Sequence, residues 1–256
     1  MPLQQDPWNG EYYKKNSDAQ FMLGTYILNQ LALKGTESVL DIGCGDGRIT
    51  AECAKKVPQG SVFGIDTSAS MIAEAKRSFA TVANLSFQQA DATYFVCNKT
   101  FDIVVSFSTF HWINDKLSAL QSIFKAFNPG GQLIIFMQNG EPAGRAKVFE
   151  SAPWKPYLGK LQQTRFYTTP AAMNTMLATC GFNDISVSAN TAPLSHASKE
   201  EMFNWAKGFA VAATGLNASL AEAFAHDLAE SVCTERDAAT GKFIEHCPFL
   251  YATAKR

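Results

Sequence analysis

The amino-acid sequence predicts an α/β protein built on a doubly wound sheet of seven strands. Short apolar runs of strand length alternate with segments in which apolar residues recur at helical spacing. One run, residues 101–107, is almost continuously apolar, as expected for a parallel strand that is buried on both faces. A glycine-rich turn at residues 43–47 joins another strand directly to a helix, which is typical of doubly wound sheets.

The order of the expected elements predicts the domain organisation. Residues 1–34 are expected to form an N-terminal segment with a helix at 21–33, and residues 193–240 a helical insertion that opens with a capping box at Ser198–Glu201. No linker interrupts residues 1–256, so we expect a single domain. The expected strands are residues 38–43, 61–66, 85–89, 101–107, 132–137, about 182–189 and 246–253.

Local signals predict where helices begin and end. Ser68 and Asn114 are expected to begin helices, Thr169 to cap a third with Pro170 in its first turn, and Gly181 to end that helix. Residues 138–169 show no clear period and are rich in glycine, proline and aromatic residues. A loop of that length in a compact domain is usually functional, often as a lid.

Composition excludes several classes of function. The net charge is −1 and no run of Lys or Arg is present, so we expect no nucleic-acid or anionic-membrane partner. The polar N-terminus lacks a signal-peptide core, and the apolar runs are too short to cross a membrane. The six cysteines are scattered without a Cys-x-x-Cys pair, which indicates reduced thiols in the cytoplasm and no metal site.

The glycine-rich turn reads Asp41-Ile42-Gly43-Cys44-Gly45-Asp46-Gly47. Glycine allows backbone angles that a Cβ forbids, and free N–H groups at the start of the next helix point at whatever occupies the turn. The dinucleotide pattern G-x-G-x-x-G would need its third glycine at Arg48. The pattern is instead Asp-x-Gly-x-Gly-x-Gly.

This pattern resembles motif I of the class I S-adenosylmethionine (SAM)-dependent methyltransferases, and the resemblance covers residues 38–137. It implies a Rossmann-like sheet that is mostly parallel, with an antiparallel last strand beside the sixth. It also implies SAM as cofactor and S-adenosylhomocysteine as product, with the methionine end of SAM held by Asp41 and by the turn at Gly43, Cys44 and Gly45. An NAD(P)-dependent oxidoreductase and a SAM-binding module without catalysis remain as alternatives.

Acidic residues follow the ends of successive expected strands. Asp66 lies 25 positions after Asp41, where an acidic residue can accept from both ribose hydroxyls. In the resembled family an aspartate at the end of the third strand binds the adenine amino group, which implies Asp91, with the amide of Ala92 on a ring nitrogen. Each can alternatively be an ordinary turn or cap residue. The remaining candidate cofactor residues are Thr67, Met71 and Ser106.

The exit of the fourth strand predicts the class of methyl acceptor. Methyltransferases of nucleic-acid or protein nitrogen often carry Asn/Asp-Pro-Pro-Tyr/Phe there, whereas this chain continues through Phe110-His111-Trp112. That exit resembles the small-molecule carboxyl O-methyltransferases, which include enzymes acting on trans-aconitate, on malonyl-acyl-carrier protein and on juvenile-hormone acid. A carboxylate is ionised at neutral pH and needs no base. A hydroxyl or carbon acceptor is the alternative.

Several residues are candidates for binding the acceptor. His111 is an anchor, a base for a hydroxyl acceptor, or a structural histidine packed on Trp112, and Arg145 and Arg165 are candidate carboxylate clamps. By resemblance, residues 8–20 form a lid over the cofactor, in which Tyr12 and Gln20 contact the acceptor. The expected partner is a small molecule, free or linked to an acyl-carrier protein by a thin patch at Lys155, Lys160 and Arg165. We expect a monomer or a homodimer.

Overall fold

The computed structural model describes residues 6, 8–158, 165–214 and 216–256. Lys160 therefore lies outside the described residues. The strands are β1 (Ser38–Ile42), β2 (Ser61–Asp66), β3 (Leu85–Gln89), β4 (Phe101–Phe107), β5 (Phe127–Gln138), β6 (Asn183–His196) and β7 (Phe243–Lys255). The helices are α1 (Gly10–Asn16), α2 (Asp18–Asn29), α3 (Arg48–Lys56), α4 (Ala69–Ser78), the 3₁₀ turn η1 (Phe110–Trp112), α5 (Lys116–Lys125), α6 (Ala143–Phe149), α8 (Pro170–Cys180), α9 (Lys199–Thr214) and α10 (Ala218–Val232).

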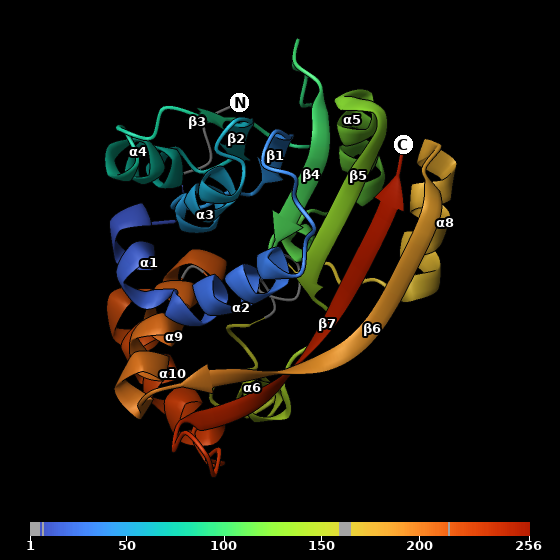
Figure 1. The fold of residues 1–256 in the computed structure, drawn as a ribbon. Coiled ribbons are helices and arrows are strands. Elements are labelled where there is room, and N and C mark those ends of the chain that lie inside the picture. The colour runs from blue at the N-terminus through green and yellow to red at the C-terminus, as the bar shows by residue number, and fades with distance from the viewer. Residues whose placement is uncertain (1–5, 7, 159–164, 215) are drawn as a thin grey trace.

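The strands form one seven-stranded sheet in the order β3-β2-β1-β4-β5-β7-β6 (Figure 1). The pairs among β1 to β5 are parallel, and β7 is antiparallel to both of its neighbours, β5 and β6. The chain order reverses between β1 and β4, so the carboxyl ends of these two strands flank the point where a doubly wound sheet binds its ligand. The predicted Rossmann-like sheet with an antiparallel last strand is confirmed.

Helices cover both faces of the sheet. On one face α5 and α8 pack onto alternate strand residues, and Leu120, Ile123 and Leu177 are fully buried there. On the other face α2 and α3 cover the remaining alternate residues through Leu28 and Cys53. The near-continuous burial of β4 follows from this double cover.

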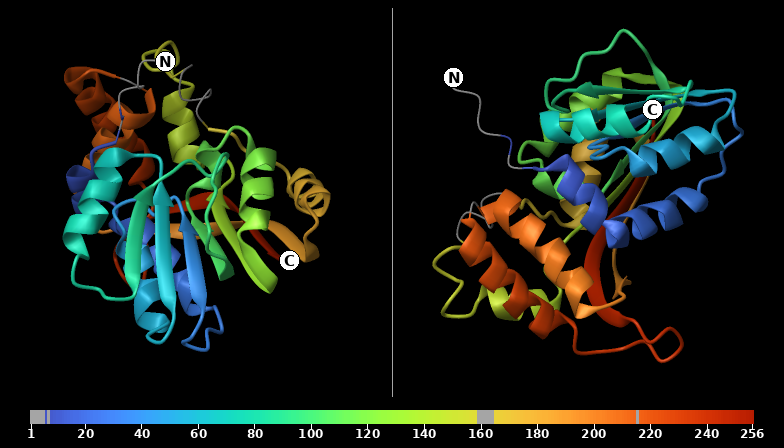
Figure 2. Two further views of the ribbon diagram at one scale, coloured as in Figure 1. Left: turned by 90° about the horizontal axis from the view of Figure 1, so that it is seen from above. Right: turned by 90° about the vertical axis from the view of Figure 1, so that its left-hand side faces the viewer.

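A second hydrophobic cluster lies beyond the carboxyl ends of the strands. α6, α9 and α10 pack together there around Phe224 and Leu228, beside the extended ends of β6 and β7 (Figure 2). The two strands pair without a break from Ser186 to His196, which is matched to Phe243. The prediction ended the sixth strand at 189 and started the last at 246. Both strands are longer than predicted because each satisfies the main-chain hydrogen bonds of the other in these extensions. Neither extension shows the strong alternation of apolar residues that would have predicted a strand.

Some of the predicted helix ends are confirmed and others are wrong. Ser68 and Thr169 cap their helices and Gly181 ends α8 in a left-handed conformation, as expected. The cap of α5 is Asp115, not Asn114, because the Asp115 carboxylate accepts from the Ser118 N–H at 3.0 Å. Helix α6 lies within residues 138–169, which were expected to be a loop. α6 lacks a side-chain cap and forms by packing on α10, which local sequence does not reveal.

The N-terminal segment is also more helical than predicted. α1 lies within residues 8–20, and α2 begins three residues before position 21 and ends before position 33. Within the described part of the chain, no helix combines the length and the apolar character needed to cross a bilayer.

Candidate active site

The glycine-rich turn lies at the carboxyl edge of the sheet, where β1 meets α3. The N–H groups of Gly43 and Cys44 donate to the carbonyl of Ile65, at 2.7 and 3.0 Å, which ties the turn to the end of β2. Gly43 has φ of +74°, and a Cβ on it would lie 2.1 Å from Thr109 Oγ1. A Cβ on Gly45 would instead meet nothing closer than a Tyr13 ring carbon, at 3.9 Å. The turn is therefore open to a ligand at Gly45.

Asp66, at the end of β2, faces this turn. Its two carboxylate oxygens accept from the N–H groups of Gly45, at 3.0 Å, and Ser68, at 2.9 Å. Burial raises the pKa of this carboxyl, and the two amides oppose that shift. Each oxygen has a further lone pair, so the carboxylate can accept from a ligand while it holds the turn.

Asp41 is buried beneath the turn and accepts a hydrogen bond from Thr50 Oγ1 at 2.7 Å. Burial raises the pKa of Asp41 to about 7, the Thr50 hydroxyl opposes the shift, and Asp66 adds to it. A cationic group near Asp41 would favour the ionised carboxylate. A carboxyl at this position thus suits the ammonium end of a zwitterionic ligand better than a phosphate.

The other candidate cofactor residues lie along the same edge. Met71 and Ala92 are buried. The Thr67 carbonyl accepts a hydrogen bond from Gln89 Nε2. The exposed Asp91 accepts from both the N–H and the hydroxyl of Thr93, and the fully buried Ser106 donates its hydroxyl to the Ile42 carbonyl. Side-chain contacts of Asp91 and Ser106 with a cofactor stay predictions.

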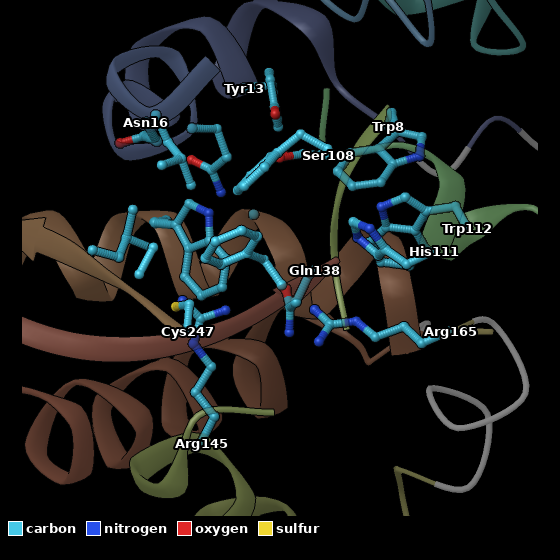
Figure 3. Close-up of a pocket in the computed structure, with 18 of the residues that line it drawn as sticks. Trp8, Tyr13, Asn16, Ser108, His111, Trp112, Gln138, Arg145, Arg165 and Cys247 are labelled. Atoms are coloured by element: carbon cyan, nitrogen blue, oxygen red, sulfur yellow. The ribbon is translucent and has the colours of Figure 1, made fainter. Parts of the chain in front are cut away.

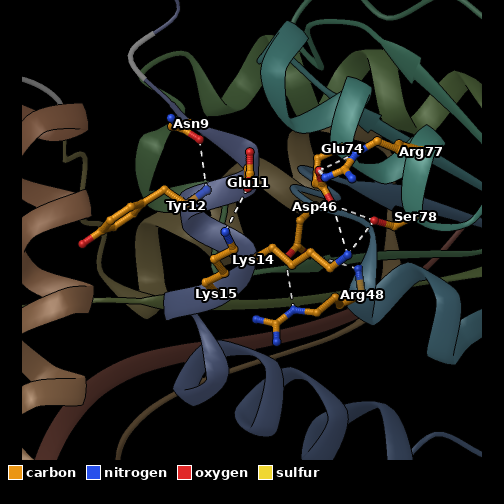
Figure 4. A network of polar contacts seen from close by, with 10 residues as sticks. All are labelled: Asn9, Glu11, Tyr12, Lys14, Lys15, Asp46, Arg48, Glu74, Arg77 and Ser78. Carbon is orange, nitrogen blue, oxygen red and sulfur yellow. Dashed lines mark hydrogen bonds and ion pairs between the residues drawn. The ribbon is translucent and has the colours of Figure 1, made fainter.

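Helix α1 lies over the turn and is held there by polar contacts (Figure 4). Lys14 Nζ lies 3.1 Å from Glu74 Oε1 on α4 and donates to Ser78 Oγ at 2.8 Å. Arg48, at the start of α3, pairs with Asp46 and with Asp18 at the start of α2, at 3.0 and 2.7 Å. These contacts join the N-terminal helices to the elements beneath them, and a lid function of residues 8–20 stays a prediction.

The lid function of α1 is tested by proteolysis. The ion pairs that join this segment to the rest of the chain have at least one partly exposed partner, and such pairs stabilise weakly. We therefore expect residues 8–20 to be cut more slowly when S-adenosylhomocysteine is bound, because ligand beneath α1 favours the closed arrangement. Equal cutting rates with and without S-adenosylhomocysteine would contradict the lid.

A cavity of about 290 Å³ lies beside the turn, beyond Ser108 at the exit of β4. Figure 3 shows Tyr13 and Asn16 above it, Trp112 and His111 on one side, and Arg145 below. Its walls come from α1, α2, η1, α9 and the ends of β5, β6 and β7. Among the described residues that line it are three cations, Arg145, Arg165 and Lys207, and no Asp or Glu.

Aromatic rings connect the lid to the wall of the cavity. Trp8 packs edge-on against Tyr13, with ring centroids 5.8 Å apart, and against Trp112, at 5.6 Å. His111 continues the row, 5.2 Å from Trp112. The N-terminal segment is therefore packed through these rings against the wall of the cavity.

Two arginines line the cavity, and each is paired with a glutamate that lies outside the lining. Arg145 pairs with Glu245 of β7, and its guanidinium carbon lies 4.1 Å from the centroid of the Trp205 ring. Burial would raise the pKa of Glu245, but Arg145 and His196 outweigh it and lower it to about 2. Arg165 pairs with Glu141 and lies 5.3 Å from the Trp112 ring centroid. Both guanidinium groups are thus fixed as donors at the cavity wall.

His111 is buried at the cavity as a neutral imidazole. Burial lowers its pKa well below the usual range, and Arg165 and Lys116 lower it further. In the described structure, His111 Nδ1 and Gln20 Oε1 are buried without a hydrogen-bond partner. Unpaired buried polar atoms are costly, and those at a cavity are suited to bind a polar ligand group.

Comparison with known proteins identifies the family. Residues 39–131 match a family described as "Methyltransferase domain". Trans-aconitate 2-methyltransferase of Deinococcus radiodurans is 29% identical over 214 residues, which cover 80% of this chain and 81% of that protein. A protein of Invertebrate iridescent virus 6 named as a methyltransferase is 38% identical over 128 residues, and the chain spans about half its length, 47%. These matches support a class I SAM-dependent methyltransferase.

Solved structures agree with this methyltransferase fold. The chain superposes on phosphoethanolamine N-methyltransferase 2 of Haemonchus contortus, solved with SAM, with a TM-score of 0.62 and 20% identity, covering 91% of this chain and 52% of that one. It also superposes on the YcgJ protein of Bacillus subtilis, with a TM-score of 0.59 and 13% identity, covering 94% and 98%. The predictions of a methyltransferase and of SAM as its cofactor are confirmed.

The residues at the sheet edge of this methyltransferase fit SAM. The open turn at Gly45 gives the main chain access to a ligand, Asp66 retains lone pairs for ribose hydroxyls, and Asp41 suits an ammonium group. When bound, SAM supplies a methyl group that is already electrophilic. The protein then has to hold the acceptor in line with that methyl group and exclude water.

The structure brings the predicted acceptor residues of the methyltransferase together around one cavity. Tyr12, Gln20, His111, Trp112 and Arg165 all line it, as does Arg145. Sequence reasoning missed lining residues that come from distant elements and carry no motif, among them Trp8, Gln138 and Trp205. It also missed Glu141 and Glu245, whose pairing with the arginines depends on the fold.

Proposed function

We propose that this methyltransferase transfers a methyl group to a carboxylate oxygen of a small organic acid with an apolar portion, giving a methyl ester. The observation that carries the proposal is the set of cationic donors at the cavity wall: Arg145, Arg165 and Lys207, each paired with a glutamate outside the lining, occur there, and no acidic residue does among the described lining residues. An ammonium acceptor would lack a counter-charge there, whereas a carboxylate finds several donors. The relatives named trans-aconitate 2-methyltransferase also support a carboxylic acid.

The cavity residues have separate parts in the proposed reaction. Arg165 and the unpaired ring nitrogen of His111, in its Nδ1–H tautomer, donate to the acceptor carboxylate and orient it. No residue has to remove a proton, because a carboxylic acid with a pKa of about 4 is ionised at neutral pH. Tyr13 and Trp8, carried by the N-terminal segment, exclude water from the reacting groups.

The apolar wall supports an acid of low total charge. Leu23, Phe136, Leu194 and Phe249 line the space between the polar groups. Glu141 and Glu245 already compensate the two arginines, so each additional carboxylate on the acceptor would be buried with little net counter-charge. An acid with an apolar body therefore fits better than one with several charges.

A carrier-protein-linked acceptor has weaker support. Arg165 is buried at the cavity and does not form part of an outer surface, and Lys155 pairs with Glu150 at 2.8 Å. A free small acid is favoured over a thioester held by an acyl-carrier protein.

A screen of acceptor classes tests the proposal. S-adenosylhomocysteine release is measured with purified enzyme and SAM against panels of free carboxylic acids, phenols, amines and an acyl-carrier-protein thioester. We expect turnover with one or more carboxylic acids. Turnover confined to amines would contradict the proposal, and S-adenosylhomocysteine binding without turnover of any panel would favour a non-catalytic module.

Substitution of His111 separates its possible roles. Because His111 is neutral and the acceptor needs no base, His111→Ala is expected to raise the acceptor KM more than it lowers kcat, by roughly tenfold for one lost hydrogen bond to a charged group. With SAM saturating, the kcat of the wild type should be flat between about pH 6 and 8. A steep fall of kcat as pH drops toward the ordinary histidine pKa would instead indicate a hydroxyl acceptor with His111 as base.

A further inference from the structure

Lys116, the first residue of α5, carries a buried charge that no carboxylate compensates. The side chain is 5% exposed, and its ammonium donates to two main-chain carbonyls, Ile113 O at 2.7 Å and Phe166 O at 2.5 Å. No Asp or Glu of the described chain forms an ion pair with it. Burying an ammonium with only neutral partners is costly, so this arrangement is not accounted for by stability.

The carbonyls that Lys116 joins belong to residues that directly follow two separate lining segments of the cavity. Ile113 directly follows η1, which carries His111 and Trp112. Phe166 directly follows Arg165. The N–H of Phe166 also donates to the carbonyl of His111, at 2.7 Å. Both main-chain polar groups of Phe166 are therefore bonded to η1 and the start of α5.

These bonds determine where Arg165 lies. The other polar contacts of its segment run to β5 and just beyond, through Glu141 to Tyr167 and through Asn139 to the Thr168 N–H at 3.0 Å. On the η1 side the segment is held by the Phe166 N–H bond to the His111 carbonyl and by Lys116, whose ammonium also lies 5.6 Å from the centroid of the Phe166 ring. Without Lys116, a single main-chain hydrogen bond from Phe166 would remain on that side.

We propose that Lys116 is a positioning residue of the acceptor site, whose ammonium ties the segment that carries Arg165 to the turn that carries His111. Lys116 is not among the residues that line the cavity, so it acts through these two. The effect of Lys116 on acceptor binding rests on the proposed carboxylate function. The hydrogen bonds of Lys116 to the Ile113 and Phe166 carbonyls can be tested without any acceptor.

The charge of Lys116 makes the tie sensitive to pH. Burial lowers the pKa of Lys116 to about 8. The charged and titratable groups around it are His111 on η1, which is neutral, the guanidinium of Arg165, and Asp115 on its own helix, which is engaged with Ser118. Loss of the proton turns charge-assisted bonds into neutral ones of roughly half the strength. Acceptor binding should therefore weaken as pH rises through about 8.

Amide hydrogen exchange of the S-adenosylhomocysteine complex measures the tie directly. In Lys116→Met the Phe166 amide is expected to exchange roughly tenfold faster than in the wild type, because the local opening that exposes this amide no longer has to break the charge-assisted bond from Lys116 to the Phe166 carbonyl. Lys116→Arg, which keeps charge and donors, should retain protection, as should Lys125→Met, an exposed lysine at the other end of α5. The affinity for S-adenosylhomocysteine should stay within about twofold in all three, because none of them touches the glycine-rich turn. Unchanged exchange of Phe166 in Lys116→Met would overturn the proposal.

The pH profile supplies a second readout and covers the case in which Lys116→Met does not fold. With an acid from the acceptor screen, the wild-type KM should rise between about pH 7.5 and 9, whereas that of Lys116→Arg stays flat because arginine keeps its proton. A KM that rises equally in both would overturn the proposal. If no acid is turned over, the proposed function fails while the exchange experiment still decides the tie, so the two failures are distinguishable.

Discussion

Asp66→Ala is expected to weaken the binding of both SAM and S-adenosylhomocysteine by about 1.5–3 kcal/mol, the scale of hydrogen bonds to a charged group. The carboxylate acts twice. It accepts from the N–H groups of Gly45 and Ser68, which fixes the open turn, and we propose that its remaining lone pairs accept from the ribose hydroxyls. Isothermal titration of the purified variant with S-adenosylhomocysteine measures the loss.

The matched control is an aspartate at the opposite edge of the sheet. Asp102 is the second residue of β4 and accepts from Ser38 and Asn128, away from the carboxyl ends of the strands. Asp102→Asn should therefore change the free energy of unfolding and leave S-adenosylhomocysteine affinity as in the wild type. Normal binding by Asp66→Ala would show that the ribose assignment is wrong.

Arg165→Gln is expected to raise the acceptor KM roughly 10- to 100-fold, with a smaller effect on kcat. The change removes a charge-assisted donor from the cavity and leaves the carboxylate of Glu141 without its main partner, close to where the acceptor carboxylate binds. Steady-state kinetics with an acid from the acceptor screen measure both parameters.

Two further variants test whether the effect on KM depends on where the lost charge lies in the cavity. Lys207 also lines the cavity but pairs with the exposed Glu222 at 3.1 Å, so Lys207→Gln should change KM little. Glu141→Gln removes the competing carboxylate and should lower KM or leave it unchanged. Equal KM values for Arg165→Gln and Lys207→Gln would argue against Arg165 as the anchor.

The cofactor side of the site was predictable because its signals are local. The Asp-x-Gly-x-Gly-x-Gly turn needs glycine for backbone reasons that hold wherever a strand meets a helix in this way, and Gly45 is indeed open to a ligand. Asp66 follows from the regular spacing of strand, helix and strand. The alternating pattern predicted the sheet, since burial on both faces leaves a long apolar run such as that of β4.

The acceptor side was predictable only in part because it depends on contacts between distant segments. Arg145 and Glu245 are 100 positions apart, and nothing near either residue indicates the other. Sequence proposed both arginines as clamps but could not show that each is neutralised by a glutamate, which changes the kind of acid that fits. Helix α6 gains its stability from packing on α10, so its own residues appeared irregular. Lys116 gave no signal at all, because one lysine at the start of a helix is ordinarily solvated.

The most direct test of the proposed carboxyl methylation is to locate the transferred methyl group. Enzyme, ¹³C-methyl-labelled SAM and an acid from the acceptor screen are incubated together, and the product is examined by ¹³C NMR before and after mild alkali. We predict a methyl ester resonance that alkali converts to labelled methanol while regenerating the acid. A labelled methyl group that resists alkali, on nitrogen, carbon or an ether oxygen, would contradict methyl transfer to a carboxylate.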